Sequence, residues 1–348
     1  MSQRNEYPSF DRAPSGSIRF NTDSAKLELY NGEAWFNIDA SSAVQHTGGT
    51  RAISAGGIIN PFSLVNTIEF VNVDTTGNAI NFGDLVSTNR SGASAADRSR
   101  MIVMGGSTPG TPNGDVDIEK ITIASTGEAV DFGGDLITGV RGAEAVNDRT
   151  RAVSVRGEHS SGDNIMQYVT IQTGGNATDF GDSAYAQSSV SKMSSPTRGV
   201  TCGRAGGTEI EYITISTLGD AAHFGDQTVR RRSSAATSNA VRGIVFAGLI
   251  PSPAAYYQSM DVVTLATLGN AQDFGDMVTA SSAGHSAAAS PTRACVFQGR
   301  QSAGPTTLNN TIEFVQFASL GNATTFGTPF QNKRSQTTSS NGHGGIGG

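Results

Sequence analysis

Hydrophobic and polar residues follow one another in short runs along most of the chain. The run IEYITI at residues 210–215 alternates β-branched or aromatic residues with polar ones, which is the period-2 pattern of a β-strand. Strings such as TTGNA and TLGNA follow these runs and place glycine where a hairpin needs a positive φ. The pattern predicts many short antiparallel strands joined by tight turns.

The same strand and turn occur in six copies, each ending in Phe-Gly. In the first copy, TIEFVNVDTTGNAINFGD, the positions of Val73, Gly77, Ala79 and Phe82 recur without insertion in every other copy. The repeated phenylalanines are 44 to 52 residues apart, so the copies differ in length elsewhere. They are Phe82, Phe132, Phe180, Phe224, Phe274 and Phe326.

An arginine followed by an apolar strand precedes each copy, as in RAISAGG and RGIVFAG. The segments between this strand and the next, such as IINPFSLVN and LIPSPAAYYQS, differ in length and composition. Variable segments joined to constant strands are loops, and repeat logic places them on one face. The six arginines are Arg51, Arg100, Arg151, Arg198, Arg242 and Arg293.

A Ser/Ala-rich stretch leads from each Phe-Gly to the next arginine and supplies a weaker fourth strand. Four strands in about 50 residues match a β-propeller blade, with a solenoid as the alternative. SSAVQHTGGTR near Ser41 and KRSQTTSSNGHGGIGG at the C-terminus both resemble the stretch that links two blades, so strands from both termini would complete one blade. We therefore expect an all-β fold, with a six-bladed propeller over residues 41–348.

The N-terminal segment 16–38 predicts a separate module of three short strands, SIRF, KLELY and AWFNI, with a hairpin signal at Asn31-Gly32. Three short strands make a marginal fold, so the apolar side needs cover from another surface. The candidate attachment residues are Phe20, Leu29, Tyr30 and Trp35, although packing within the core is an alternative for Trp35. Residues 1–15 are expected to form an extended arm, and the domain is taken as residues 1–40.

Composition narrows the set of partners. The 348 residues carry a net charge of −6, and their longest basic run is Arg230–Arg232, so nucleic acid is not expected as a partner. No apolar stretch is long enough to span a membrane, and no signal-peptide layout precedes the module. Cys202 and Cys295 lie in apolar strands and are expected to be buried free thiols.

The candidate chemistry is sparse. The five histidines form no short ligand cluster, and each Phe-Gly-Asp contributes one carboxylate where a calcium site needs several oxygen ligands. We expect no metal, no cofactor and no catalytic residue. The repeat arginines either pair with carboxylates or carbonyls of their own or the adjacent blade, or line the channel and hold an anion. An aspartate also recurs after the Phe-Gly pair, and in copy six Thr328 stands in its place. The repeated aspartates are Asp84, Asp135, Asp182, Asp226 and Asp276.

Two parts of the chain resemble virion structural proteins of tailed bacteriophages, particularly contractile-tailed cyanophages. The unit from Ile210 to Asp226 is similar to repeats of such proteins, and Gly16 to Ile38 is similar to a module of phage tail-fibre and other appendage proteins. The strand ending in Gly-Gly also resembles kelch repeats, without their tryptophan. The resemblance implies a structural virion component, assembled in the host cytoplasm and present in several copies.

The expected function is therefore structural: residues 1–40 attach the chain to other virion proteins, and the propeller serves as an interaction module. An alternative is recognition of a host-surface glycan by the variable loops. The most binding-like loop holds Tyr256 and Tyr257 beside Pro251 and Pro253. A polysaccharide depolymerase is a minor alternative, because no copy gains a cluster of carboxylates.

Overall fold

The computed structural model describes residues 13–22, 26–37, 50–155, 157, 164–185, 189–203, 207–251, 254–280, 286–297, 299–300 and 308–347. The chain divides into two compact units, Met1–Thr47 and Gly48–Gly348. The segment 41–49, which was expected to help close the ring, lies outside the described residues. Each unit is described by itself below.

The N-terminal unit is a three-stranded antiparallel sheet of order β1-β2-β3. Its strands are β1 (Ile18–Asn21), β2 (Lys26–Tyr30) and β3 (Trp35–Asn37). The side chain of Asn31 accepts hydrogen bonds from the N–H groups of Glu33 and Ala34, both at 2.8 Å, and Gly32 has φ +104°. These contacts form the turn that the Asn-Gly pair predicts.

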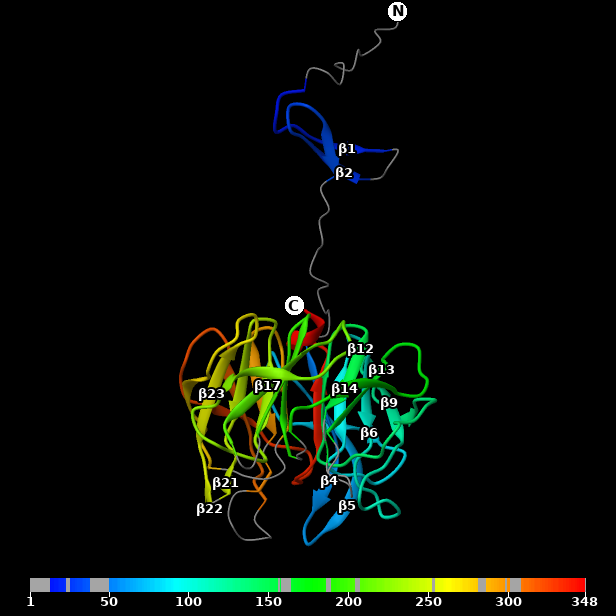
Figure 1. Ribbon diagram of the computed structural model, residues 1–348, viewed down its shortest axis with the longest axis vertical. Coiled ribbons are helices and arrows are strands. Elements are labelled where there is room, and N and C mark those ends of the chain that lie inside the picture. Colours follow the sequence, from blue (N-terminus) through cyan, green and yellow to red (C-terminus); the bar gives the residue numbers. More distant parts are fainter. Residues whose placement is uncertain are drawn as a thin grey trace, which may run out of the picture. The chain divides into compact units, whose positions relative to one another are not determined.

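The second unit contains six four-stranded antiparallel sheets within the described residues (Figure 1). Sheet one consists of β29 (Thr337–Ser340), β4 (Arg51–Ile59), β5 (Ser63–Asn72) and β6 (Ile80–Asp84). Sheet two consists of β7 (Ala93–Ala96), β8 (Arg100–Met104), β9 (Ile118–Thr122) and β10 (Val130–Asp131). Sheet three consists of β11 (Glu144–Asn147), β12 (Arg151–Val155), β13 (Ile165–Thr170) and β14 (Thr178–Asp182).

Sheet four consists of β15 (Ser191–Ser194), β16 (Arg198–Cys202), β17 (Glu209–Thr214) and β18 (Ala222–Asp226). Sheet five consists of β19 (Ala235–Ser238), β20 (Arg242–Phe246), β23 (Ser259–Thr264) and β24 (Gln272–Asp276), with a hairpin of β21 (Leu249–Pro251) and β22 (Ala254–Tyr256) between its second and third strands. Sheet six consists of β25 (Ser286–Ala289), β26 (Arg293–Phe297), β27 (Ile312–Gln316) and β28 (Thr324–Gly327).

The Ser/Ala-rich stretches form the innermost strands of these sheets. β7, β11, β15, β19, β25 and β29 contact one another in that order, and β29 also contacts β7. Four of these strands, β7, β19, β25 and β29, consist only of Ala, Ser and Thr residues and are buried, which allows the backbones to approach one another closely. The fold is thus all-β, with separate four-stranded sheets arranged as in a propeller; we call the space between the six innermost strands the central channel.

Sheet one is built from both ends of the second unit. The C-terminal strand β29 pairs with β4 in the register Thr337↔Ala55 to Ser340↔Ala52. The C-terminus therefore supplies the innermost strand, and β4 to β6 supply the other three. Beyond β29 the chain ends in a short 3₁₀ turn, η2 (Gly344–Ile346).

The core lies between neighbouring sheets. The repeat phenylalanines are all buried, and Phe82 packs with residues of its own sheet and with Met101 and Ile121 of the next. Phe82 also makes an edge contact with Phe70, with ring centroids 5.6 Å apart. Each phenylalanine therefore joins two sheets, which explains why its position is fixed within the repeat.

A β-bulge at Phe-Gly explains how this side chain reaches the core. On β17 and β18 the register runs from Ile210↔Gly225 to Glu211↔His223, which leaves Phe224 as the extra residue. The same shift occurs in sheets one, three, five and six. Because of it, Ile210 and Glu211 are both buried, so the third strand is not a simple alternation of buried and exposed residues.

Candidate functional site

The six repeat arginines join each sheet to the next. Arg198 Nη1 donates to Leu265 O at 3.0 Å, and Arg293 of sheet six donates to Asp74 O of sheet one at 2.9 Å. The other four donate in the same way to carbonyls just beyond the third strand of the next sheet: Arg51 to Ile123 and Ala124, Arg100 to Ile171 and Gln172, Arg151 to Ile215, and Arg242 to Phe317. Of the two expected arrangements, the structure shows pairing with carbonyls of the adjacent sheet.

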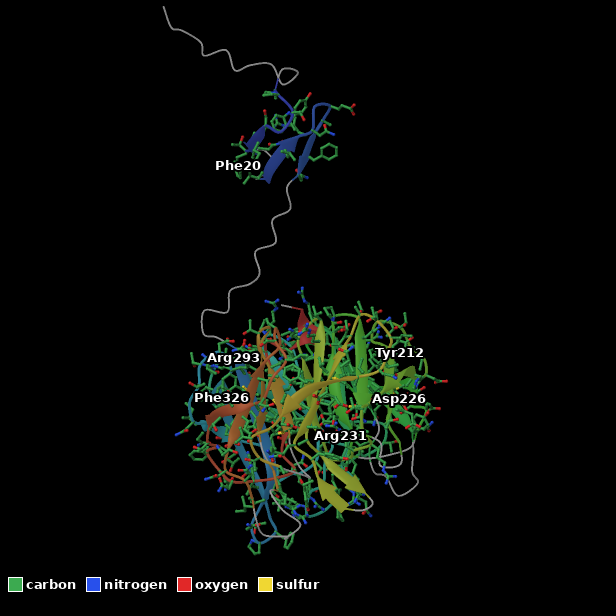
Figure 2. All side chains as sticks on the ribbon, turned by 90° about the vertical axis from the view of Figure 1, so that its left-hand side faces the viewer. Phe20, Tyr212, Asp226, Arg231, Arg293 and Phe326 are labelled. Carbon is green, nitrogen blue, oxygen red and sulfur yellow. The ribbon has the colours of Figure 1, made fainter. Side chains whose placement is uncertain are left out.

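Four of these arginines also stack on an aromatic ring. The Arg198 guanidinium lies 5.1 Å from the ring centroid of Tyr212, which in turn makes an edge contact with Phe224. Figure 2 labels Tyr212 of sheet four and Arg293 of sheet six. Arg51, Arg151 and Arg293 make the same contact with Phe70, Tyr168 and Phe314. The guanidinium groups thus bind protein carbonyls and rings, and they do not provide the anion-holding ring that was the alternative.

The third residue of Phe-Gly-Asp acts through its backbone. Asp226 N–H donates to Asn270 Oδ1 of the next sheet at 3.1 Å, and Asp226 O accepts from Ala271 N–H at 2.8 Å. In copy six, Thr328 makes the same two contacts with Asn78 and Ala79. Because the side chain is not needed for these bonds, threonine can replace aspartate.

Sequence reasoning missed a buried acceptor on the third strand of every sheet. Glu69 Oε2 accepts from Phe330 N–H at 2.7 Å, and Gln167 Oε1 accepts from Ile137 N–H at 2.7 Å. Each acceptor holds the link that follows Phe-Gly in the preceding sheet. The set is Glu69, Glu119, Gln167, Glu211, Asp261 and Glu313. The signal was a polar residue directly after the first buried isoleucine or methionine of each third strand.

Two of these acceptors also form buried ion pairs. Arg231, the middle residue of the basic run, lies 2.8 Å from Asp261, and both side chains are fully buried. Lys333 lies 3.5 Å from Glu69. Burial lowers the pKa of Lys333, and Glu69 opposes this shift. Both cations lie in links between two sheets, so each ion pair connects a link to the third strand of a sheet.

The C-terminal turn closes one end of the central channel. His343 Nε2 binds Ala96 O at 2.8 Å, and His343 Nδ1 accepts from Gly345 N–H at 3.1 Å. Arg149 Nε donates to Ile346 O at 2.6 Å. The pKa of His343 is lowered to about 4, mainly because the ring is buried, and the positive charge of Lys192 contributes to this shift. Residues 343–347 form a plug, which lies at the end of the unit opposite β21 and β22 (Figure 1).

A lysine crosses the interior of the channel. Lys192 Nζ on β15 donates to the backbone carbonyl and the hydroxyl of Ser94 on β7, and lies 3.2 Å from Glu144 Oε2 on β11. Burial raises the pKa of the Glu144 carboxyl, and Lys192 opposes this shift. A cavity of about 20 Å³ beside Lys192 and His343 has room for about one water. The channel is thus nearly filled between the plug and Lys192.

The other end of the channel is an open hollow of about 200 Å³, which we call the channel mouth. It is lined by residues that precede the innermost strands, including Ser91, Gly142, Ser189, Ser233 and Ser335. Their backbones are bonded in sequence: Ser91 N–H to Ser335 O, Gly142 N–H to Ser91 O, Ser189 N–H to Gly142 O, and Ser233 N–H to Ser189 O. Gln336 and Glu144 also line the hollow.

The variable loops lie on the same face as the channel mouth. Isolated β-bridges pair loop residues with the links between sheets, as in Ile58↔Arg334 and Leu249↔Arg232. Tyr256 and Tyr257 are half-buried, and the Arg231 guanidinium lies 5.9 Å from the Tyr257 ring centroid. Tyr257 therefore packs against its own sheet, and Pro253 lies outside the described residues.

The attachment candidates divide between two faces of the N-terminal sheet. The register Ile18↔Leu29 and Leu29↔Phe36 places Phe20 and Leu29 on one face, whereas Tyr30 and Trp35 pair on the other. The latter two rings pack 5.2 Å apart. The expectation that all four residues share one apolar side was wrong, because neighbouring positions on a strand face opposite sides.

The search for other chemistry gives limited results within the described ranges. No three His, Cys, Asp or Glu residues there come close enough to hold a metal ion. Cys202 and Cys295 are buried and form no disulfide. His46, His159 and His285 lie outside the described residues. No helix in the described part of the chain has the length and apolar character needed to cross a membrane.

No protein-family model matches this chain, and no curated protein matches it either.

Proposed function

We propose that this chain is a non-catalytic structural protein of a tailed-phage particle, attached to other virion proteins by its N-terminal sheet. The observation that carries the proposal is one apolar face of that sheet. Its five side chains are between 38% and 62% exposed: Ile18, Phe20, Leu27, Leu29 and Phe36. A face of this kind on a three-stranded sheet is stable in water only when another surface covers it.

The opposite face of the same sheet supports this assignment because its side chains already contact one another. Arg19 forms an ion pair with Glu28 at 2.7 Å, and its guanidinium lies 4.2 Å from the Trp35 ring centroid. Hydrogen bonds from Asn21 and Arg19 lower the pKa of Glu28. The polar face thus holds the sheet together, and the apolar face is left for a partner.

We further propose that the six sheets form a closed six-bladed propeller, a rigid body suited to display and assembly. Sheet six bonds to sheet one through Arg293 and Asp74 and through Thr328 and Asn78, and β29 completes sheet one. Each kind of junction between neighbouring sheets therefore recurs between the last sheet and the first. A closed ring leaves no innermost strand without neighbours.

The test is incorporation of the full-length chain into phage particles, measured by quantitative mass spectrometry of purified virions. The double variant Phe20→Ser/Leu29→Ser should be lost from particles while its second unit stays folded. The control Val130→Ser changes a side chain that is 52% exposed on the second unit, and should be incorporated normally. Normal incorporation of the double variant would refute attachment through this face, and absence of the wild-type chain from virions would refute the virion assignment.

Recognition of a surface glycan by the variable loops is the second candidate. It is supported by the position of these loops on one face with Tyr256, which is half-exposed. A glycan array with the wild-type chain and the Tyr256→Ala variant tests it: retained binding in the variant would remove Tyr256 from the site.

A further inference from the structure

The residue beside the repeat arginine differs between sheets. In sheets one, three, four and six it is the phenylalanine or tyrosine whose ring centroid lies 4.4 to 5.2 Å from the guanidinium. It stands on the third strand, two residues before the cross-strand partner of the arginine. Sheet two has Lys120 at this position. Sheet five has Val262, which has the smallest side chain of the six.

Arg242 of sheet five therefore lacks the ring that covers its counterparts. It keeps their hydrogen bond, since its Nη1 donates to Phe317 O of sheet six at 2.7 Å. Among the described residues, however, no aromatic ring stacks on its guanidinium, and the side chain is half-buried. The cation is thus held in place by the next sheet but is without its usual ring partner.

A hollow of about 310 Å³ lies at this position, which we call the sheet-five groove. Its lining includes Arg242, Val262, Gln272 and the turn at residues 267–270, together with Leu320 from the turn of sheet six. The groove thus contacts both the arginine and the position that carries the ring in other sheets. The replacement of an aromatic residue by valine explains why space is left there.

Two exposed leucines flank the groove. Leu268 is 54% exposed and Leu320 is 59% exposed, whereas Val262 between their two turns is only 8% exposed. The apolar surface thus extends from a buried floor onto the turns of two neighbouring sheets. Large exposed apolar side chains beside an unfilled hollow are typical of a surface that meets another protein.

The lining favours an aromatic ring over an ion. Arg242 is the one charged residue in the described lining, so a cation would be repelled. An anion would gain from Arg242, but Val262 and the two leucines offer it no hydrogen bond. An aromatic ring can stack on the guanidinium and place its edges against the apolar side chains. Four other sheets already combine an arginine with such a ring.

We propose that the sheet-five groove binds a phenylalanine or tyrosine side chain of another protein. The ring stacks on Arg242 above Val262, and the exposed leucines contact the rest of the bound segment. Aromatic anchors of this kind, seated in a hollow, supply much of the affinity of protein interfaces. The groove uses no residue of the N-terminal sheet, so this contact and attachment through that sheet can fail independently.

The experiment is saturation-transfer NMR on the full-length chain with three probes: the peptide N-acetyl-Gly-Phe-Gly-amide, its leucine counterpart N-acetyl-Gly-Leu-Gly-amide, and phenol. The phenylalanine peptide should bind the wild-type chain. The leucine peptide should bind at least about fivefold more weakly, because it cannot stack on the guanidinium. Sodium sulfate serves as a competitor that tests for an anion site.

One variant fills the groove with the ring that sheet four has. Val262→Tyr should abolish binding of the phenylalanine peptide, because the new side chain takes the place of the bound ring. It should unfold at the same or a higher temperature than the wild type, since stacking on Arg242 is restored. Loss of binding would then not result from loss of folding.

A second variant tests the groove without changing a buried residue. Leu268→Ser/Leu320→Ser should bind the phenylalanine peptide at least about fivefold more weakly. The matched control is Leu218→Ser, at the corresponding turn of sheet four; Leu218 is 58% exposed but does not line the groove. This control should bind as the wild type does.

Several results would overturn the proposal. They are absence of binding by the phenylalanine peptide at tens of millimolar, equal binding of the leucine peptide, and wild-type binding by either Val262→Tyr or the leucine double variant. Binding of phenol without the peptide would show that the groove takes a small aromatic molecule instead of a protein side chain. Displacement of the peptide by sodium sulfate would show an anion site on Arg242.

Discussion

At the scale of single residues, the same contacts recur in the repeat even where the residue type differs between copies. At Glu69, Glu119 and Gln167, the buried position on the third strand accepts hydrogen bonds from two backbone N–H groups, and both a carboxylate and an amide can do so. Gln167 accepts from Ile137 and Thr138 N–H and donates to Thr138 O as well. Negative charge is therefore not required at this position.

Glu119 provides a test, because it accepts from Val86 and Ser87 N–H. Burial is the main cause that raises the pKa of Glu119. The wild-type chain thus loses stability as the pH rises through this raised pKa, because the ionised form is disfavoured in the fold. Glu119→Gln should remove this loss, so its gain in unfolding free energy should be larger at pH 8 than at pH 4.

Glu119→Leu is the contrasting variant, since it leaves two buried N–H groups without an acceptor. It should cost about 1–3 kcal/mol of unfolding free energy at either pH. Urea denaturation followed by circular dichroism measures both variants, because the single tryptophan, Trp35, lies in the other unit. Equal pH dependence in the wild type and Glu119→Gln would contradict the argument.

The repeat arginines should not tolerate lysine. Arg198 combines a hydrogen bond to Leu265 O with stacking on Tyr212, and a planar guanidinium suits both contacts better than an ammonium group. Arg198→Lys should destabilise the chain by about 1 kcal/mol. Arg232→Lys, at an exposed arginine, should change stability by less than about 0.5 kcal/mol in the same denaturation assay.

At the scale of elements, the Phe-Gly bulge and the glycine turn of the next sheet form a matched pair. The bulge directs phenylalanine into the core, and the following glycine lets the next turn approach closely. At the junction of sheets six and one, a Cβ on Gly327 would lie 2.1 Å from Gly77 O, whereas a Cβ on Gly77 would meet no atom within 4 Å. At this contact, position 327 has no room for a side chain, whereas position 77 does.

This asymmetry predicts opposite effects for two alanine substitutions. Gly327→Ala should force the last and first sheets apart and cost about 1–3 kcal/mol or more. Gly77→Ala should be neutral or stabilise the chain by up to about 1 kcal/mol, through a smaller entropy of the unfolded chain. Urea unfolding midpoints of the two full-length variants decide the matter: similar midpoints would mean that the junction is not closely packed.

The elements also show what the sequence reveals and what it hides. Fixed offsets from Val73 to Phe82 predicted the strands, because each offset reflects a contact present in every copy. The burial of Glu211 could not be predicted by alternation, because it depends on a bulge that shifts the partner strand by one residue. Likewise, the gathering of Ser91, Ser189 and Ser233 around the channel mouth could not be predicted, because it depends on how the six sheets meet.

At the scale of the second unit, the residues near the C-terminus form two features that the repeat alone does not explain, the strand β29 and the plug. The similarity of both ends to a linking stretch predicted one sheet of mixed origin, and β29 now shows that the C-terminus supplies its innermost strand. The plug beyond β29 has no counterpart in the other copies, so repeat logic could not predict it. It contacts β11 and β15 and bonds to Ala96, which brings three sheets together at one end of the channel.

The plug should make this unit sensitive to acid through one histidine. The neutral His343 ring satisfies both nitrogens, since Nδ1 accepts from Gly345 N–H and Nε2 donates to Ala96 O. A proton on Nδ1 would place two donors against each other. The positive charge of Lys192 disfavours that proton. The negative charge of Asp97 favours it, but this effect is smaller than the opposing effect of burial.

The folded-state pKa of about 4 lies below the ordinary value of 6.5, so the stabilising contribution of neutral His343 is fully present above pH 6.5. It is lost as the pH falls from 6.5 towards 4, by about 3 kcal/mol at one pKa unit per 1.36 kcal/mol. The variant His343→Asn cannot titrate, so the difference in unfolding free energy between wild type and variant should shrink over this range. Since Glu119 and Glu144 shift stability in the opposite direction, this difference isolates the histidine, and a constant difference from pH 7 to pH 4 would show that protonation does not oppose the plug.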